Sequence, residues 1–209
     1  MNHFSSLLKK SLKENAIVLD ESAQQKLVHY LELLTTWNRT FNLTSITTPR
    51  DMVYLHIIDS LAISPFLHGT KILDVGSGAG LPGIPLAILH PEKQWTLVDK
   101  TRKKTQFLTQ VIAELHLPNV QIIHSRAEDF HPTTCFDSIL SRAYGTLGLF
   151  LTQTEHLLCP DGLFLAMKGK YPEAELQEIP NRFAISFAKR VEWLGIKVER
   201  HVVGIYKTS

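Results

Sequence analysis

The chain has 209 residues, a length that fits one compact domain with a small extension better than two full domains. Hydrophobic residues make up 44% and charged residues 20%, which is typical of a globular protein that buries its own core without covalent cross-links. The formal net charge of +2 does not by itself indicate a nucleic-acid-binding protein, so only local basic clusters can argue for one.

Residues 1–68 read as a helical extension. Asp20 is the expected N-cap of a helix whose apolar residues recur at helical spacing, namely Leu27, Tyr30, Leu31 and Leu34. Thr48 and Asp51 form a capping box that starts a second, amphipathic helix over residues 52–66. The chain begins without an apolar segment, and no stretch approaches the ~18 uncharged apolar residues of a membrane span, so we expect neither a signal peptide nor a transmembrane helix.

From residue 69 onward, short apolar strands alternate with helices, a pattern that predicts parallel βαβ units with right-handed crossovers. The expected strands cover residues 71–75, 95–98, 120–124, 137–141 and 162–167, and the expected helices cover residues 82–89, 102–115 and 147–158. Segments 184–193 and 199–206 are further strands whose connection is too short for a parallel crossover, so we expect an antiparallel hairpin. The sequence thus predicts an α/β fold in which residues 69–209 form one compact domain.

The two cysteines, Cys135 and Cys159, form neither a Cys-x-x-Cys pair nor a recognisable disulfide framework. We therefore expect no disulfide and a reducing, cytoplasmic location. Cys159 precedes a proline in the turn before the fifth strand, where turn formation explains it better than a nucleophilic role. The ten histidines show no His-Glu-x-x-His or similar ligand spacing, so we expect no metal site.

A glycine-rich turn joins the first strand to the following helix, at the edge where open α/β sheets bind their ligands. Gly78-x-Gly80-x-x-Gly83 matches the dinucleotide-binding fingerprint, and Asp99 follows at a suitable distance for a ribose hydroxyl. This interpretation requires a pyrophosphate at the helix N-terminus and predicts a nicotinamide-dependent oxidoreductase. The single mononucleotide-binding half argues against it.

The overlapping pattern Asp74-x-Gly76-x-Gly78-x-Gly80 resembles motif I of the class I S-adenosylmethionine (SAM)-dependent methyltransferases. SAM carries no phosphate, but it has ammonium and sulfonium charges that Asp74 can balance. Asp99, at the end of the second strand, can accept hydrogen bonds from the ribose hydroxyls. The C-terminal hairpin resembles the sheet of these methyltransferases rather than a second mononucleotide-binding half, which favours SAM.

The residues after the glycines make the resemblance more specific. The run from Ile72 to Leu86, with its Leu-Pro-Gly-Ile-Pro extension, resembles the RsmG (GidB) family of bacterial small-subunit ribosomal RNA guanine-N7 methyltransferases. Other segments agree in order and spacing: residues 37–44 (Trp-Asn-Arg-Thr-Phe-Asn-Leu-Thr), 56–60 (His-Ile-Ile-Asp-Ser), 125–128 (Ser-Arg-Ala-Glu), 141–143 (Ser-Arg-Ala) and 165–169 (Leu-Ala-Met-Lys-Gly). Met167 stands where the family more usually has leucine. The resemblance covers residues 20–207.

This resemblance implies a Rossmann-like class I methyltransferase sheet with SAM as its cofactor. It implies that Gly76 and Leu81 border the cofactor, that Ala127 and Glu128 frame its adenine, and that Arg142 lies beside the methionine end or the substrate base. The implied substrate is a guanosine in the helix 18 loop of 16S rRNA, within the assembled 30S subunit. We expect a monomer that needs no obligate protein partner and no membrane.

The sequence lacks the catalytic motifs of other classes of nucleic-acid methyltransferase, which agrees with methylation of guanine N7. Guanine N7 carries a free lone pair, so its methylation needs no strong general base. Catalysis then depends on in-line alignment, which can supply on the order of 7–11 kcal/mol. The chain has no Asn/Asp-Pro-Pro-Tyr/Phe motif of amino-methyltransferases and no Pro-Cys nucleophile for pyrimidine C5.

Arg142 is the candidate catalytic residue, because a guanidinium can stack on a base, donate hydrogen bonds to it or orient a phosphate. The alternative for Arg142 is a structural salt bridge. His56 and Asp59 lie one helical turn apart and can form a polar pair, which either gates the substrate or simply packs the extension against the sheet.

Local basic clusters supply candidate RNA contacts despite the low net charge. The candidates are Lys100, Arg102, Lys103, Lys104, Lys168 and Arg200, and Lys9, Lys10 and Lys13 form a further cluster. Their separation along the chain fits several phosphate contacts better than one deep groove, although each cluster can equally be a solvated face. Other interpretations stay open: a methyltransferase of a different RNA, a small molecule or a protein, in which the extension closes a pocket, or a non-enzymatic binding module.

Overall fold

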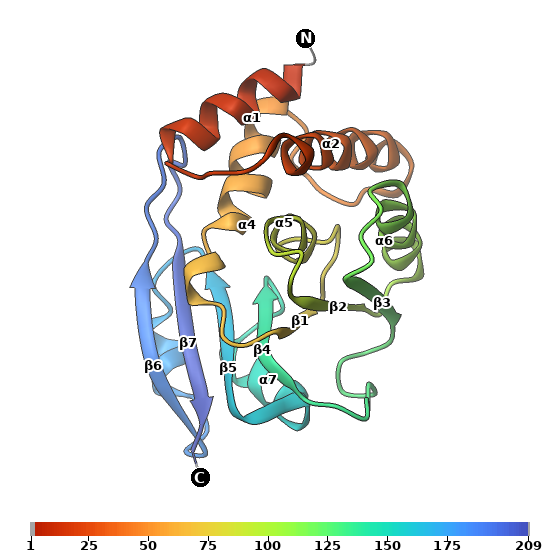
Figure 1. Cartoon of the computed structure of the whole chain (residues 1–209). Coiled ribbons are helices and arrows are strands. Elements are labelled where there is room, and N and C mark those ends of the chain that lie inside the picture. Colours follow the sequence, from red (N-terminus) through yellow and green to blue (C-terminus); the bar gives the residue numbers. More distant parts are fainter. Residues whose placement is uncertain (1–2, 209) are drawn as a thin grey trace.

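The computed structural model describes residues 3–208, and its centre is a seven-stranded sheet with the order β3-β2-β1-β4-β5-β7-β6 (Figure 1). The strands are β1 (Lys71–Val75), β2 (Gln94–Asp99), β3 (Val120–His124), β4 (Phe136–Arg142), β5 (Leu158–Lys168), β6 (Phe183–Arg190) and β7 (His201–Lys207). Strands β1 to β5 pair in parallel, whereas β7 is antiparallel to both β5 and β6. The predicted α/β sheet with a C-terminal antiparallel hairpin is confirmed.

The helices follow the predicted order, with one addition. They are α1 (His3–Glu14), α2 (Glu21–Phe41), α3 (Pro49–Met52), α4 (Asp59–Leu61), α5 (Gly83–Leu89), α6 (Arg102–Glu114), α7 (Leu147–Thr154) and α8 (Glu173–Gln177). The sequence did not predict α8, whose five residues are too few to show a helical hydrophobic period. None of the helices in residues 3–208 is long and apolar enough to cross a membrane.

Side-chain caps start the two helices for which they were predicted. The Asp20 carboxylate accepts a hydrogen bond from the backbone N–H of Ala23 at 2.7 Å, which caps α2. The Thr48 hydroxyl accepts one from the N–H of Asp51 at 3.2 Å, which caps α3. Both contacts satisfy N–H groups that have no partner inside the first helical turn.

We expect Asp20→Ala to lower the free energy of unfolding by about 1 kcal/mol, because the N–H of Ala23 loses its acceptor at the start of a long helix. Urea denaturation followed by circular dichroism measures this difference. Glu21→Ala, in the same turn, is the control, since Glu21 does not supply the cap. Equal stability of Asp20→Ala and the parent chain would contradict the assignment of this cap.

The sheet buries a different hydrophobic cluster on each of its faces, because successive strand residues point to opposite sides. Ile72, Leu97 and Leu140 belong to the cluster shared with α2, α5 and α6. Their neighbours Leu73, Val98 and Ile139 belong to the cluster shared with α7. Figure 1 shows α5 and α6 on one side of the sheet and α7 on the other. This layering leaves the carboxyl ends of the parallel strands open at one edge.

The N-terminal extension packs into the first of these clusters. The Tyr30 ring centroid lies 6.4 Å from that of Phe107 on α6, and the Tyr30 hydroxyl donates a hydrogen bond to the carbonyl of Ala79 at 2.7 Å. The connection between β6 and β7 also reaches the end of α1, where Asn15 accepts a hydrogen bond from the N–H of Leu194 at 2.7 Å (Figure 1). The extension therefore contacts both the glycine turn and the C-terminal hairpin.

The predicted amphipathic helix over residues 52–66 is more buried and less regular than expected. Its centre, Val53–Ile58, has π-helical hydrogen bonding, and α4 follows it directly. His56 and Asp59 are buried because this segment lies between α1 and the sheet, with α5 beside it (Figure 1). Single π-helical turns inside helices often occur at functional sites. Here the turn brings two polar side chains toward the open edge of the sheet.

The expectation that the two cysteines stay unpaired is wrong in this structure. Cys135 and Cys159 form a disulfide, with Cα atoms 4.9 Å apart. They become neighbours because β4 and β5 pair in parallel and both cysteines lie where these strands begin. The spacing of two cysteines in the sequence carries no information about which strands pair.

Candidate functional site

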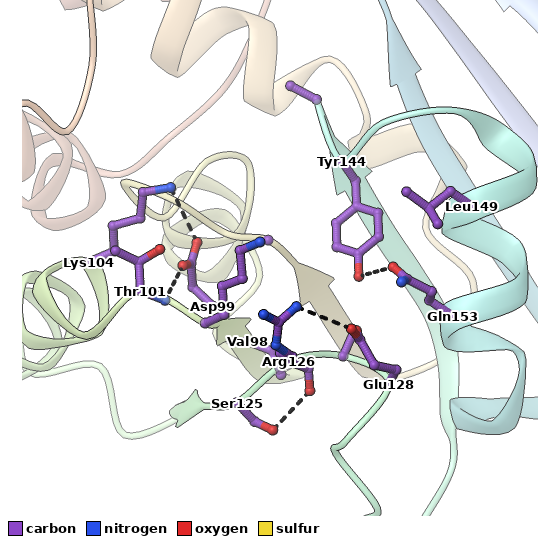
Figure 2. A pocket seen from close by; sticks show the side chains of 14 residues that line it. Val98, Asp99, Thr101, Lys104, Ser125, Arg126, Glu128, Tyr144, Leu149 and Gln153 are labelled. Carbon is purple, nitrogen blue, oxygen red and sulfur yellow. Dashed lines mark hydrogen bonds and ion pairs between the residues drawn. The ribbon is translucent and has the colours of Figure 1, made fainter.

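A cavity of about 340 Å³ opens at the carboxyl ends of the central strands. Figure 2 shows its lining, to which β2 contributes Asp99, the segment after β3 contributes Glu128, and the segment after β4 contributes Tyr144. Gly76, directly after β1, also lines it, as does Leu149 from α7. This is the edge at which parallel α/β sheets bind ligands, and the volume lies within the range of small-molecule sites.

The glycine turn adopts backbone conformations that require glycine at two positions beside the cavity. Gly76 has a φ of +65° and Gly78 a φ of +60°, which side chains rarely tolerate. The Gly76 N–H donates to the carbonyl of Val98 at 2.8 Å, which fixes the turn against β2. A Cβ atom on Gly76 would lie 2.9 Å from the Tyr144 ring. Among the predicted glycine-turn residues only Gly76 lines the cavity: Gly78 is half-buried beside it, and Gly80 and Leu81 are buried.

Asp74 lies buried beneath this turn, with an unusual combination of contacts. Its Oδ2 accepts a hydrogen bond from the N–H of Gly83 at 3.0 Å, whereas its Oδ1 has no partner among the described residues. Burial raises the pKa of the Asp74 carboxyl to about 7, although the Gly83 hydrogen bond and the charge of Arg142 act in the opposite direction. A buried acceptor without a partner is costly, so the site favours a cationic donor at this position.

Asp99 joins the glycine turn to the start of α6. Its Oδ2 accepts a hydrogen bond from the N–H of Gly78 at 2.9 Å. Its Oδ1 accepts one from the N–H of Thr101 at 2.8 Å (Figure 2). Lys104 Nζ lies 3.6 Å from Oδ2. Each carboxylate oxygen can accept a further hydrogen bond, so these contacts leave capacity for ribose hydroxyls from the cavity.

The side of the cavity predicted to hold adenine contains residues that the sequence analysis missed. Ala127 and Glu128 line it as expected. Opposite them lies the Tyr144 ring, whose hydroxyl donates a hydrogen bond to Gln153 Oε1 at 2.9 Å (Figure 2). The turn that presents Tyr144 is strained, because Ala143 has a φ of +60°. Since the segment after β4 also belongs to the ligand-binding edge, its position in the sequence was a usable signal for Tyr144.

Arg142 ends β4 but does not line the cavity. Its Nη1 donates hydrogen bonds to the carbonyl of Leu55 at 3.1 Å and to Asp59 Oδ2 at 3.3 Å. The salt bridge considered as an alternative is therefore present. It does not use all the guanidinium donors, so a role toward the substrate stays a prediction.

The expected pair between His56 and Asp59 does not form. His56 Nε2 lies 3.0 Å from the Thr44 hydroxyl, whereas Asp59 is bonded to arginines. Burial, together with the charge of Arg142, lowers the pKa of His56 to about 4, so this imidazole is neutral near pH 7.

The candidate RNA-contacting residues lie in four different environments. Lys100 and Lys104 line the cavity, and Arg102 and Lys103 are exposed at the start of α6. Lys168 instead forms an ion pair with Glu175 at 2.8 Å and also donates to the carbonyl of Gly145. The remaining candidate, Arg200, lies directly before β7 and forms an ion pair with Asp59 at 2.6 Å. Within residues 3–208, no group of three or more acidic, histidine or cysteine side chains is placed to bind a metal.

The sequence is similar to a known family over most of its length. The model of the family described as rRNA small subunit methyltransferase G matches residues 23–203. The ribosomal RNA small subunit methyltransferase G of Nitrosococcus oceani is 44% identical over 198 residues, which are 95% of this chain and 92% of that relative. The protein of the same name from Chromobacterium violaceum is 46% identical over 197 residues, 94% of each chain.

Solved structures share the fold at much lower identity. The magnesium protoporphyrin IX methyltransferase of Synechocystis, solved with bound SAM, is 15% identical with a TM-score of 0.59 and covers 91% of this chain and 99% of its own. A SAM-dependent methyltransferase from Aquifex aeolicus is 17% identical with a TM-score of 0.57, over 74% of this chain and 92% of its own. At these identities the likeness concerns the fold alone.

Proposed function

The chain belongs to the rRNA small subunit methyltransferase G family, and on that basis we propose that it transfers the methyl group of SAM to N7 of a guanosine in 16S rRNA. The observation that supports this proposal best is the combination of the family match with the cavity beside the glycine turn. SAM supplies an electrophilic methyl group on a sulfonium centre when it is bound.

The residues that line the cavity, together with Asp74 buried beneath the glycine turn beside it, fit the charges of SAM. The unpartnered Oδ1 of Asp74 suits the ammonium group of the methionine part, and Asp99 suits the ribose hydroxyls. Ala127 and Tyr144 offer apolar surface for the adenine, and Glu128 and Gln153 offer polar atoms at its edge. These residues hold and orient the cofactor, and none of them is required to remove a proton.

Because guanine N7 carries no proton, the proposed mechanism needs no general base. Guanine N7 has a free lone pair, so the chain has to bring this atom into line with the methyl group and exclude competing geometries. His56 is neutral and bonded to Thr44, which suits a packing role rather than that of a base. Arg142 is the residue we propose to contact the guanosine or its phosphate.

Asp74 gives SAM binding a specific pH dependence. Its pKa of about 7 in the free protein means that the carboxyl must lose a proton to face an ammonium group. We expect SAM affinity to rise between about pH 6 and about pH 7.5, and we expect Asp74→Asn to abolish this rise. Because this pKa is raised, the protonated carboxyl stabilises the free fold, and that stabilisation is lost as the pH rises through about 7.

Isothermal titration of SAM at several pH values, in buffers of different ionisation enthalpy, measures both the affinity and the proton release. S-Adenosylhomocysteine, which retains the ammonium but lacks the sulfonium charge, serves as a matched ligand and should show the same dependence. An affinity that does not change with pH in the parent chain would contradict the assignment of the ammonium to Asp74.

We further propose that the substrate is the assembled 30S subunit and that the chain acts on it as a monomer in the cytoplasm. The low net charge supports a target that is recognised at several separate points. The basic residues near the site are distributed accordingly, with Lys100 and Lys104 in the cavity and Arg102 and Lys103 exposed beside it. The target base has to be accessible outside a base stack, as in a loop.

Methyl-labelled SAM tests the class of substrate. The protein is incubated separately with unmodified 30S subunits, naked 16S rRNA, a tRNA pool and a protein-plus-metabolite extract freed of RNA. The proposal predicts label in 16S rRNA, with more from 30S subunits than from naked rRNA. Label confined to tRNA, protein or small molecules would overturn the ribosomal assignment while leaving the SAM site intact.

A further inference from the structure

Asp59 is the meeting point of three segments that are far apart in the sequence. It begins α4, directly after the π-helical turn of the extension. Its Oδ2 accepts a hydrogen bond from Arg142 Nη1 at 3.3 Å, at the end of β4, and its Oδ1 accepts one from Arg200 Nε at 2.6 Å, just before β7. The carboxylate therefore holds together the extension, the central sheet and the C-terminal hairpin.

The charges of this cluster do not cancel. One carboxylate, whose side chain is 1% exposed, faces two guanidinium groups that are 24% and 25% exposed, so the cluster carries one net positive charge. Two arginines brought together without Asp59 would repel each other, and removing one member of a buried ionic cluster is strongly unfavourable. Asp59 is thus the group that allows both guanidinium groups to occupy the same edge.

The arginines retain hydrogen-bonding capacity that the protein does not use. Arg142 donates hydrogen bonds from Nη1 to Asp59 and to the carbonyl of Leu55. Arg200 donates from Nε to Asp59 and from Nη1 to the carbonyl of Glu199. Among the described residues, neither Nη2 has a partner. Guanidinium groups with free donors and a net positive charge suit a phosphate, which accepts several charge-assisted hydrogen bonds at once.

The position of the cluster links it to the reaction. Arg142 is followed directly by Ala143, which lines the cavity, and its charge acts on Asp74 beneath the glycine turn. A phosphate held by the two arginines would therefore lie at the edge of the cofactor cavity. This is the place where the backbone of an RNA substrate must pass if one of its bases enters the site.

We infer that Asp59 is a positioning residue, which holds Arg142 and Arg200 side by side as a clamp for a backbone phosphate of the RNA substrate. The inference rests on the proposed function and adds to it a specific phosphate contact. Asp59 itself touches no substrate and acts through the two arginines. The same hydrogen bonds attach the extension, through Asp59, to the end of β4 and to the segment before β7.

Asp59→Asn distinguishes positioning from simple attraction of charge. The substitution makes the edge more positive, so non-specific attraction alone would lower the KM for 30S subunits. If Asp59 orients the arginines, the KM for 30S subunits rises about tenfold, as expected from misplaced binding groups, while kcat and the Kd for SAM change less than twofold. An unchanged or lower KM, or an equal loss of SAM binding, would overturn the inference.

Two further variants keep the test decisive. Asp59→Glu retains the carboxylate and should restore most of the lost affinity for 30S subunits. Arg200→Gln leaves a neutral pair of Arg142 and Asp59, so it tests the clamp even if Asp59→Asn does not fold, and an unchanged KM for this variant would also refute the clamp. Glu155→Gln breaks a more exposed ion pair, with Arg182, outside the cavity and serves as the control for loss of an ion pair away from the site.

The parent chain is assayed first, so that the two levels of the argument fail separately. If it transfers no methyl group to any RNA, the proposed function is wrong. If it methylates 30S subunits and Asp59→Asn does so with an unchanged KM, the function stands and the clamp is refuted.

Discussion

Replacing Arg142 with alanine should lower kcat/KM for 30S subunits by about 10²-fold, the loss expected when a residue that positions the substrate is removed. The substitution removes a positive charge that acts on Asp74, yet it leaves Asp59 paired with Arg200. The fold should therefore survive, and the Kd for SAM should change far less than the rate. Single-turnover methylation at saturating SAM measures the effect.

Arg142→Lys is the informative companion to this variant. Lysine keeps the positive charge but lacks the planar set of donors that can contact Asp59 and a substrate group together. We expect it to recover only a small part of the lost rate. Full activity of Arg142→Lys would show that charge alone suffices, and full activity of Arg142→Ala would reduce this residue to a structural salt bridge.

Gly76→Ala should weaken SAM binding by about 10–100-fold, which corresponds to about 1.4–2.8 kcal/mol. The added methyl group would lie 2.9 Å from the Tyr144 ring, and a φ of +65° is unfavourable for alanine. Either the ring or the glycine turn must move, and both border the cavity. Equilibrium binding of SAM, together with thermal unfolding, separates lost affinity from lost stability.

Gly148→Ala is the matched control for Gly76→Ala. Gly148 lies in α7, and an added Cβ would meet no atom within 4 Å. Alanine is favoured over glycine in a helix, so this variant should keep its affinity for SAM and gain slightly in stability. If Gly76→Ala binds SAM as well as Gly148→Ala does, the cavity beside Gly76 is not the cofactor site.

Local signals in the sequence predict the fold well. The alternation of short apolar strands with helices predicts the parallel part of the sheet, and the short connection after β6 predicts the antiparallel hairpin. The side chains of Asp20 and Thr48 cap the helices for which they were predicted. Each of these features depends on residues that are close in the sequence, which is why a sequence pattern can reveal them.

Contacts between distant residues account for what the sequence does not predict. The pairing of Cys135 with Cys159 depends on β4 and β5 being neighbours. The bond between Asp59 and Arg200 spans 141 positions, and no spacing rule connects them. The glycine turn indicates where the cavity lies, but only the packing of the segment after β4 brings Tyr144 over Gly76.

The most direct test of the proposed reaction identifies the nucleoside that receives the methyl group. Unmodified 30S subunits are incubated with the protein and methyl-labelled SAM, the 16S rRNA is digested to nucleosides, and the labelled product is identified by mass spectrometry. We predict that the label appears in 7-methylguanosine at a single position. Label in another nucleoside, such as N6-methyladenosine, would contradict methylation of guanine N7, and formation of that product requires the loss of a proton.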